Sequence, residues 1–153
     1  MQDTTIYIGA DYHGFKKKEK LKSYLTNFHD ISIKVKDMGT ADEKQDDYND
    51  PAISVSKAIK SDPGSYGILL CGSAHGVCIQ SNRFKGIRAI NAYSEESAKL
   101  GREHDDANVI CLSAELLSIE EMKKILYTFF HTEFKGEERR IRRIKKLDKE
   151  NYD

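Results

Sequence analysis

The sequence is poor in cysteine and in long apolar runs. It holds only three cysteines, and no two of them form a CxxC pair. An odd number of cysteines without that spacing argues against a disulfide framework and a zinc site, so we expect no metal and a reducing compartment, the cytoplasm. No apolar run approaches the roughly 20 residues of a membrane span, and the first residues lack the regions of a signal peptide. We therefore expect no membrane partner.

The chain also lacks an excess of either charge. Lys plus Arg and Asp plus Glu are 25 each, which gives a formal net charge of zero. That balance gives no reason to expect a nucleic-acid partner. The exception is the segment 139–149, where seven basic residues stand against Asp148 alone. A basic end on a neutral protein suits a small anion better than a duplex.

Apolar residues switch between strand-like and helix-like spacing along the chain. The pattern predicts strands at 6–9, 31–37, 67–71, 87–90 and 108–112, and helices at 14–28, 51–61, 95–103 and 118–131, with another ending near 82. The second helix is expected to begin at Pro51, with Asp50 as its N-cap. This order predicts one α/β domain over residues 1–153, a Rossmann-like three-layer α/β/α arrangement around a five-stranded parallel sheet. A basic C-terminal helix within 136–153 could leave the domain body and reach a neighbouring subunit.

In open parallel sheets, ligands bind at the carboxyl ends of the strands. The segment 71–77 follows a continuous apolar run, and its glycines Gly72 and Gly76 allow backbone N–H groups to turn toward an anion. Cys71 at the edge of such a loop would have its thiolate favoured. The alternative is that Cys71 is a small buried strand residue beside two turn glycines. Two further cysteines lie in apolar segments and are expected to be inert core thiols, namely Cys78 and Cys111.

Two polar loops carry further candidates for acid–base chemistry. Asp11, Tyr12 and His13 follow the first strand and could bind a polyol and relay protons. Alternatively, Asp11 is a helix N-cap and His13 a solvated loop residue. His104 precedes Asp105 in a second polar segment, and a histidine near carboxylates is a natural acid–base group. It could equally be an exposed turn residue.

Arg139 and Arg143 are four residues apart on the predicted last helix, so they share one face. Guanidinium groups suit phosphate, although a run of charge is usually only a solvated helix face. The glycine loop 72–76 lacks the GK[ST] sequence of a P-loop, and no GxGxxG motif is present. We therefore expect no nucleotide cofactor.

Six ordered segments together resemble the family of ribose-5-phosphate isomerase B, which includes the subunits of galactose-6-phosphate isomerase. The resemblance covers nearly the whole chain, from Ile6 to about Leu147. It rests on GADYHGF at 9–15, DMGT at 37–40, DY at 47–48, CGSAHG at 71–76, SNRFKGIRA at 81–89 and HDDANV at 104–109. Several motifs in order at the family's spacing are far more specific than any one of them.

The resemblance implies an aldose–ketose isomerase that needs no metal or cofactor and interconverts ribose 5-phosphate and ribulose 5-phosphate through a cis-enediolate. Cys71 would be the base that moves the proton between C1 and C2, and Ser73 would assist at the substrate oxygens. His104 with Asp11 would open the furanose ring. The amides of the glycine loop would hold the enediolate charge. The remaining implied substrate contacts are Tyr12, His13, Tyr48, Gly72, Ala74, His75, Gly76, Asp105, Asn108, Arg139 and Arg143. The family also implies a homodimer or homotetramer with sites between subunits.

The chain departs from the family pattern mainly on the substrate side of the site. Tyr12 stands where the family has a histidine, and His13 follows one place later. Ala74 replaces a glycine, Asp105 replaces an asparagine, and Glu115 stands where the family often has an arginine. These changes keep two alternatives open: the same chemistry on a tetrose or hexose phosphate, or a sugar-phosphate-binding paralogue without activity.

Overall fold

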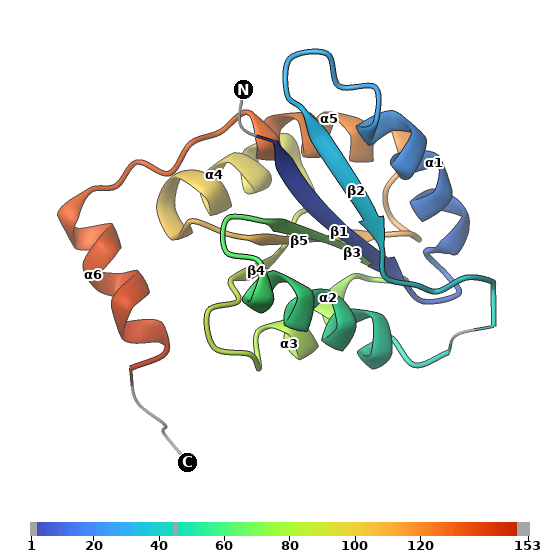
Figure 1. Ribbon diagram of the computed structural model, residues 1–153, viewed down its shortest axis with the longest axis horizontal. Helices are drawn as coiled ribbons and strands as arrows, with labels where there is room; N and C mark the ends of the chain where they lie inside the picture. The colour runs from blue at the N-terminus through green and yellow to red at the C-terminus, as the bar shows by residue number, and fades with distance from the viewer. Residues whose placement is uncertain (1–2, 45, 150–153) are drawn as a thin grey trace.

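The computed structural model describes residues 3–44 and 46–149, which form a five-stranded parallel sheet covered by helices (Figure 1). The strands are β1 (Thr4–Ala10), β2 (Ile33–Asp37), β3 (Tyr66–Cys71), β4 (Ala89–Asn91) and β5 (Val109–Ser113), in the spatial order β2-β1-β3-β5-β4. The helices are α1 (Phe15–Leu25), α2 (Asn49–Ser61), α3 (His75–Ser81), α4 (Glu95–Asp105), α5 (Ile119–Phe130) and α6 (Glu138–Leu147). The predicted α/β class, the parallel sheet and the element order are confirmed.

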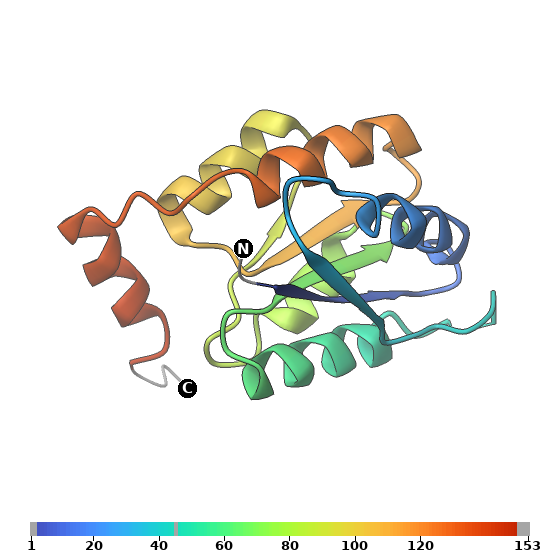
Figure 2. The ribbon, with the colours of Figure 1, turned by 45° about the horizontal axis from the view of Figure 1, so that its top comes forward.

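Helices cover both faces of the sheet, as Figure 2 shows, with α1, α4 and α5 on one face and α2 and α3 on the other. Side chains that alternate along a strand therefore enter two separate apolar clusters. Ile68 and Leu70 of β3 pack on the α1, α4 and α5 side, whereas Leu69 and Cys71 pack on the α2 and α3 side. The apolar run of β3 is continuous because both of its faces are buried.

The order in which strands are added to the sheet reverses between the paired strands β1 and β3: β2 lies beyond β1, whereas β5 and β4 lie beyond β3. From β1 the chain continues through α1 on one face, and from β3 it continues through α3 on the other face (Figure 1). The loops after these two strands therefore leave the sheet toward opposite faces. Ligands of open parallel sheets bind at such a position, beyond the carboxyl ends of the strands. The loop after β1 begins at Asp11 and the loop after β3 begins at Gly72, so two predicted site segments meet at this reversal.

The structure corrects the predicted start of the second helix and shows that the last helix stands apart from the domain body. The helix α2 begins at Asn49, with Tyr48 rather than Asp50 at the N-cap, and Pro51 occupies its third position. Proline is tolerated there because the first-turn N–H groups have no partner within the helix. The helix α6 buries none of its residues and stands beside the body on the side of the amino ends of the strands (Figure 1). Within the described residues, no helix combines the length and apolar character needed to cross a membrane.

A buried lysine fixes the segment beside the end of β1. Lys18 of α1 is fully buried, and its ammonium group donates to both Asp37 carboxylate oxygens at 2.7 Å and to the Thr40 carbonyl at 2.8 Å. Burial alone would raise the pKa of Asp37, but the hydrogen bonds from Lys18 and Lys22 outweigh it and hold that pKa below its usual value. These bonds position the 37–40 loop next to Asp11.

We expect Lys18→Met to lower the free energy of unfolding by about 2–3 kcal/mol in urea denaturation at neutral pH. Losing one partner of a buried ion pair leaves the other charge uncompensated, although Lys22 still pairs with Asp37 and moderates the loss. The exposed Lys20→Met is the matched control and should change stability by less than about 0.5 kcal/mol. Because the pKa of Asp37 is lowered, the contribution of this pair is present above the usual carboxyl pKa of 3.8 and is lost on further acidification. Equal losses in both variants would contradict this account.

Candidate active site

The loop between β3 and α3 directs its backbone amides at the sulfur of Cys71. Ala74 lies in the left-handed region with φ of 67°, just before α3 begins at His75. This conformation turns the chain so that the N–H groups of Ala74, Gly76 and Val77 donate to the Cys71 sulfur. Amides that converge on one acceptor in this way are the geometry that an anion-binding loop requires, and here the acceptor is the Cys71 sulfur.

The pKa of Cys71 is set by opposing effects, and the net shift is upward rather than downward. Burial raises the pKa of this thiol, the amide of Val77 opposes the increase, and the negative charge of Asp11 raises the pKa further. The amides of Ala74 and Gly76 also favour the thiolate, but the net shift is upward. The loop amides therefore act in the expected direction, but burial, which leaves only 4% of the residue exposed, outweighs them.

Hydrogen bonds from the end of β5 hold the loop between β3 and α3 in place. The Ser113 hydroxyl donates to the Gly72 carbonyl at 2.6 Å, and the Ala114 amide donates to the Cys71 carbonyl at 2.9 Å. The Glu115 amide adds a third bond to the Gly72 carbonyl at 3.1 Å. These contacts extend the pairing of β3 with β5 beyond the strands, so the position of the Cys71 backbone is set from both sides.

The loop after β1 brings a carboxylate and an imidazole to the same place. Asp11 is buried, its amide donates to the Leu70 carbonyl, and its carboxylate accepts from the Gly14 amide at 3.2 Å. Burial raises the pKa of Asp11, although the Gly14 amide and His13 oppose the increase. The ring of His13 lies 4.0 Å from that of Tyr12, measured between centroids, and both side chains are partly exposed.

Two glycines in the loop are required by close neighbours. A Cβ at position 72 would lie 2.8 Å from a carboxylate oxygen of Glu115, and a Cβ at position 76 would lie 2.6 Å from the Tyr48 ring. Glu115 therefore lies against Gly72, and the ring of Tyr48 covers Gly76. Tyr48 is 38% exposed, so one side of its ring faces outward.

His75 and Ser73 are exposed on the rim of the loop. The side-chain amide of Asn91, at the end of β4, lies 2.8 Å from His75 Nδ1 and donates to the Ser73 carbonyl at 3.3 Å. The Ser73 hydroxyl accepts from the His75 amide at 3.4 Å. Asn91 thus ties the two rim residues to the sheet.

Five predicted site residues lie elsewhere in the same chain. Asn108 precedes β5 and its carbonyl accepts from Gly67, four residues before Cys71 on β3. Four residues of strand span about 13 Å, so the turn from α4 to β5 lies at the opposite edge of the sheet from Cys71. That edge carries His104, Asp105 and Asn108, and beyond it α6 carries Arg139 and Arg143. A single chain does not bring these five residues to Cys71.

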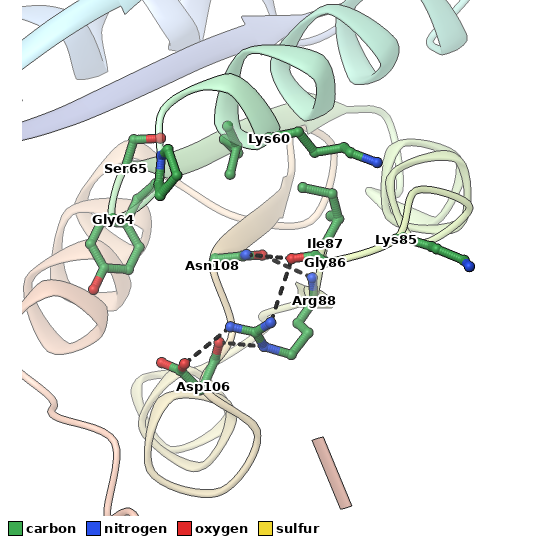
Figure 3. Close-up of a pocket in the computed structure, with 12 residues that line it drawn as sticks. Lys60, Gly64, Ser65, Lys85, Gly86, Ile87, Arg88, Asp106 and Asn108 are labelled. Carbon is green, nitrogen blue, oxygen red and sulfur yellow. Dashed lines mark hydrogen bonds and ion pairs between the residues drawn. The ribbon is translucent and has the colours of Figure 1, made fainter. Parts of the chain in front are cut away.

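A cavity of about 410 Å³ opens at that opposite edge (Figure 3). Asn108 lines it, but both ends of its side-chain amide are used, since the oxygen accepts from the Arg88 amide and the nitrogen donates to the Gly86 carbonyl. Arg88 is held by Asp106, and the ammonium groups of Lys60 and Lys85 point away from Asn108 in Figure 3. This cavity is far from Cys71 of the same chain, and within it the Asn108 amide holds the backbone of Gly86 and Arg88.

Several residues at the site were missed or underestimated from the sequence. Lys18 looked like one more surface lysine of α1, and Ser113 and Asn91 carried no signal beyond their place at strand ends. Glu115 was noted only as a departure from a family pattern. Cys111 is fully buried as predicted, whereas Cys78 is partly exposed and its thiol donates to the Ala89 carbonyl. Among residues 3–44 and 46–149, no group of three His, Cys, Asp or Glu side chains is arranged to hold a metal ion.

Comparisons with known proteins find relatives over most of the chain. A family profile described as Ribose/Galactose Isomerase matches residues 6–147. The chain is 37% identical to a probable ribose-5-phosphate isomerase B of Mycoplasma pneumoniae, over 86% of this chain and 85% of the relative. It is 31% identical to ribose-5-phosphate isomerase B of Escherichia coli, over 86% of each chain.

Solved structures match over nearly the full length. A ribose 5-phosphate isomerase of Thermotoga maritima is 40% identical with a TM-score of 0.88, covering 95% of this chain and 97% of that one. Ribose-5-phosphate isomerase B of Mycoplasma genitalium, solved with bound ribulose-5-phosphate, is 36% identical with a TM-score of 0.87. That match covers 96% of this chain and 95% of the other.

We expect Gly76→Ala to lower the free energy of unfolding by about 1 kcal/mol, because the new methyl group would push the Tyr48 ring off the loop. In a Tyr48→Ala background the same substitution should instead stabilise by roughly 0.5–1 kcal/mol, since alanine suits a helix better than glycine. Urea denaturation of the four proteins in this double-mutant cycle measures the coupling. The same sign in both backgrounds would show that Tyr48 does not cover Gly76 in solution.

Proposed function

The chain belongs to the ribose/galactose isomerase family, and from that membership we propose that it interconverts ribose 5-phosphate and ribulose 5-phosphate. The observation that carries the proposal is the sulfur of Cys71, placed at the end of β3 with three backbone amides directed at it. A base and a set of anion-stabilising donors in one loop are what proton transfer next to a carbonyl requires. The scheme uses no metal and no organic cofactor.

In the proposed reaction, the Cys71 thiolate removes the proton from C2 of the open-chain aldose. The electron pair moves toward the carbonyl oxygen and gives a cis-enediolate, and the sulfur then returns the proton to C1. When the sulfur becomes neutral, the amides of Ala74 and Gly76 lose their charged acceptor and are available to the enediolate oxygens. Ser73, exposed beside the loop, would assist proton transfer between these oxygens.

The proposed site needs residues from a second copy of the chain. His104 and Arg143 lie at the far edge from Cys71 in their own chain, and α6 buries none of its residues. A two-fold axis would place the far edge of each copy beside the Cys71 loop of the other. His104 of the second copy would then open the sugar ring with Asp11, and Arg139 and Arg143 would bind the phosphate. We propose a homodimer, with a homotetramer as the next assembly.

We also infer that the enzyme works in the cytoplasm. All three cysteines are unpaired thiols, and the proposed base among them must stay reduced to act. A reducing compartment keeps such thiols available.

We expect Cys71→Ser to lower kcat for ketose formation from ribose 5-phosphate by about 10²- to 10⁴-fold, because a hydroxyl is a far weaker base than a thiolate. Circular dichroism and thermal unfolding should remain close to those of the native chain. In the native chain kcat should rise with pH above neutrality, because the pKa of the free thiol is raised and the thiolate is the active form. Full activity of Cys71→Ser would remove Cys71 from the mechanism.

The interfacial site is tested by complementation between two inactive variants. We expect Cys71→Ala and His104→Asn homodimers each to be inactive, whereas a purified heterodimer should regain about half of the native activity, since one of its two sites is intact. The heterodimer is obtained by coexpression with two different affinity tags. A heterodimer as inactive as its parents would rule out a site shared in this way.

A further inference from the structure

Three side chains lie in a row from the buried end of the site to its surface. His13 Nδ1 is 3.8 Å from Asp11 Oδ2, and His13 Nε2 is 3.7 Å from Glu115 Oε1. The exposed fraction of the side chain rises along the row, from 6% for Asp11 to 40% for His13 and 60% for Glu115. The imidazole thus connects a buried carboxylate with one in contact with solvent.

The buried end of this row lies beside Cys71, because Ala10 and Leu70 are partners in the parallel pairing of β1 with β3 and Asp11 and Cys71 directly follow them. The Asp11 amide donates to the carbonyl of Leu70, the residue before Cys71, and the Asp11 carboxylate raises the pKa of the thiol. Burial also raises the pKa of Asp11 itself, so this carboxylate accepts a proton more readily than an exposed one. A proton that moves from Cys71 to Asp11 removes the negative charge that disfavours the thiolate.

The groups that neighbour His13 come from the loops after β1 and β5. The loop after β1 contributes Asp11 and the neighbouring Tyr12 ring, and the loop after β5 contributes Glu115. Lys17 of α1 fixes that second loop, because its ammonium group donates to the carbonyls of Ala114 and Leu117 at 2.7 and 2.6 Å. His13 is therefore flanked by two carboxylates and lies against one aromatic ring at an interplanar angle of 32°.

We propose that His13 and Glu115 form a proton relay that exchanges the Cys71 proton with solvent through Asp11. The relay rests on the proposed isomerase function and adds two residues to it. Neither His13 nor Glu115 need touch a reacting atom, so both act through Asp11 as positioning residues. The relay connects the Cys71 proton with solvent, whereas the thiolate itself is regenerated when the sulfur returns its proton to C1.

Each step of the relay moves one proton and leaves the electron pair behind. The Cys71 S–H bond breaks and an O–H bond forms on Asp11. That O–H bond then breaks as Nδ1 of His13 takes the proton, and the imidazolium releases a proton from Nε2 to Glu115 or to water. The distances of 3.7 and 3.8 Å exceed a direct hydrogen bond, so each transfer uses a small side-chain rotation or one bridging water.

Isomerisation in D₂O tests the relay. While the proton taken from C2 resides on Cys71, the relay exchanges it for a deuteron, so part of the ketose carries deuterium at C1. We expect His13→Gln and Glu115→Gln each to lower the deuterated fraction of product by about threefold or more at neutral pD, as mass spectrometry measures.

Matched controls separate the relay from general effects of the substitutions. His29→Gln and Glu133→Gln change exposed residues of the same types and should leave the deuterated fraction unchanged. If His13→Gln and Glu115→Gln form ketose with the native deuterated fraction, the relay is overturned while the isomerase function stands. If the native chain forms no ketose from ribose 5-phosphate, the proposed function and the relay fail together.

Discussion

The site depends on the hydrogen bonds from three backbone amides to the sulfur of Cys71. These bonds exist because Ala74 adopts a left-handed conformation, which costs an alanine about 1–2 kcal/mol. Burial of the Ala74 side chain offsets that cost, since the side chain is fully buried in the apolar cluster on the α2 and α3 side of the sheet. A glycine would relieve the backbone but would leave that packing incomplete. The loop is therefore held by burial at Ala74 and by the bonds from Ser113 and Ala114 at its other end.

Asp37 and Asp11 show how neighbouring groups set the pKa of a carboxylate and thereby its role. Asp37 faces the ammonium groups of Lys18 and Lys22, so its pKa falls and its charge is permanent near neutrality. Asp11 has only amide donors and His13 nearby, so burial dominates and its pKa rises. The first carboxylate fastens a loop, whereas the second can exchange a proton. The fixed ion pair lies beside the adjustable carboxylate because the 37–40 loop extends the pairing with β1 as far as Ala10.

The sequence was sufficient for the fold because hydrophobic spacing reports burial directly, and burial decides which elements form the sheet. The continuous run of β3 and the glycine loop after it could be read without a structure, since local backbone geometry limits what such a segment can do. Other features depend on contacts between distant residues. Lys18 is buried only because Asp37, 19 positions later, meets it across two elements. The raised pKa of Cys71 likewise depends on packing and on Asp11, which no local pattern reports.

Parallel topology explains why one chain holds only part of the proposed site. Every strand of the sheet runs in the same direction, so the loops that follow strands gather at one edge and the turns that precede them gather at the other. Cys71 follows a strand and His104 precedes one, so no local rearrangement of loops can bring them together within a subunit. On the proposed function, symmetric association would overcome this constraint, because a two-fold axis can place unlike edges of identical chains face to face. On the proposed function, the exposed helix α6 then serves chemistry and association at once, and dissociation of the subunits would by itself abolish catalysis.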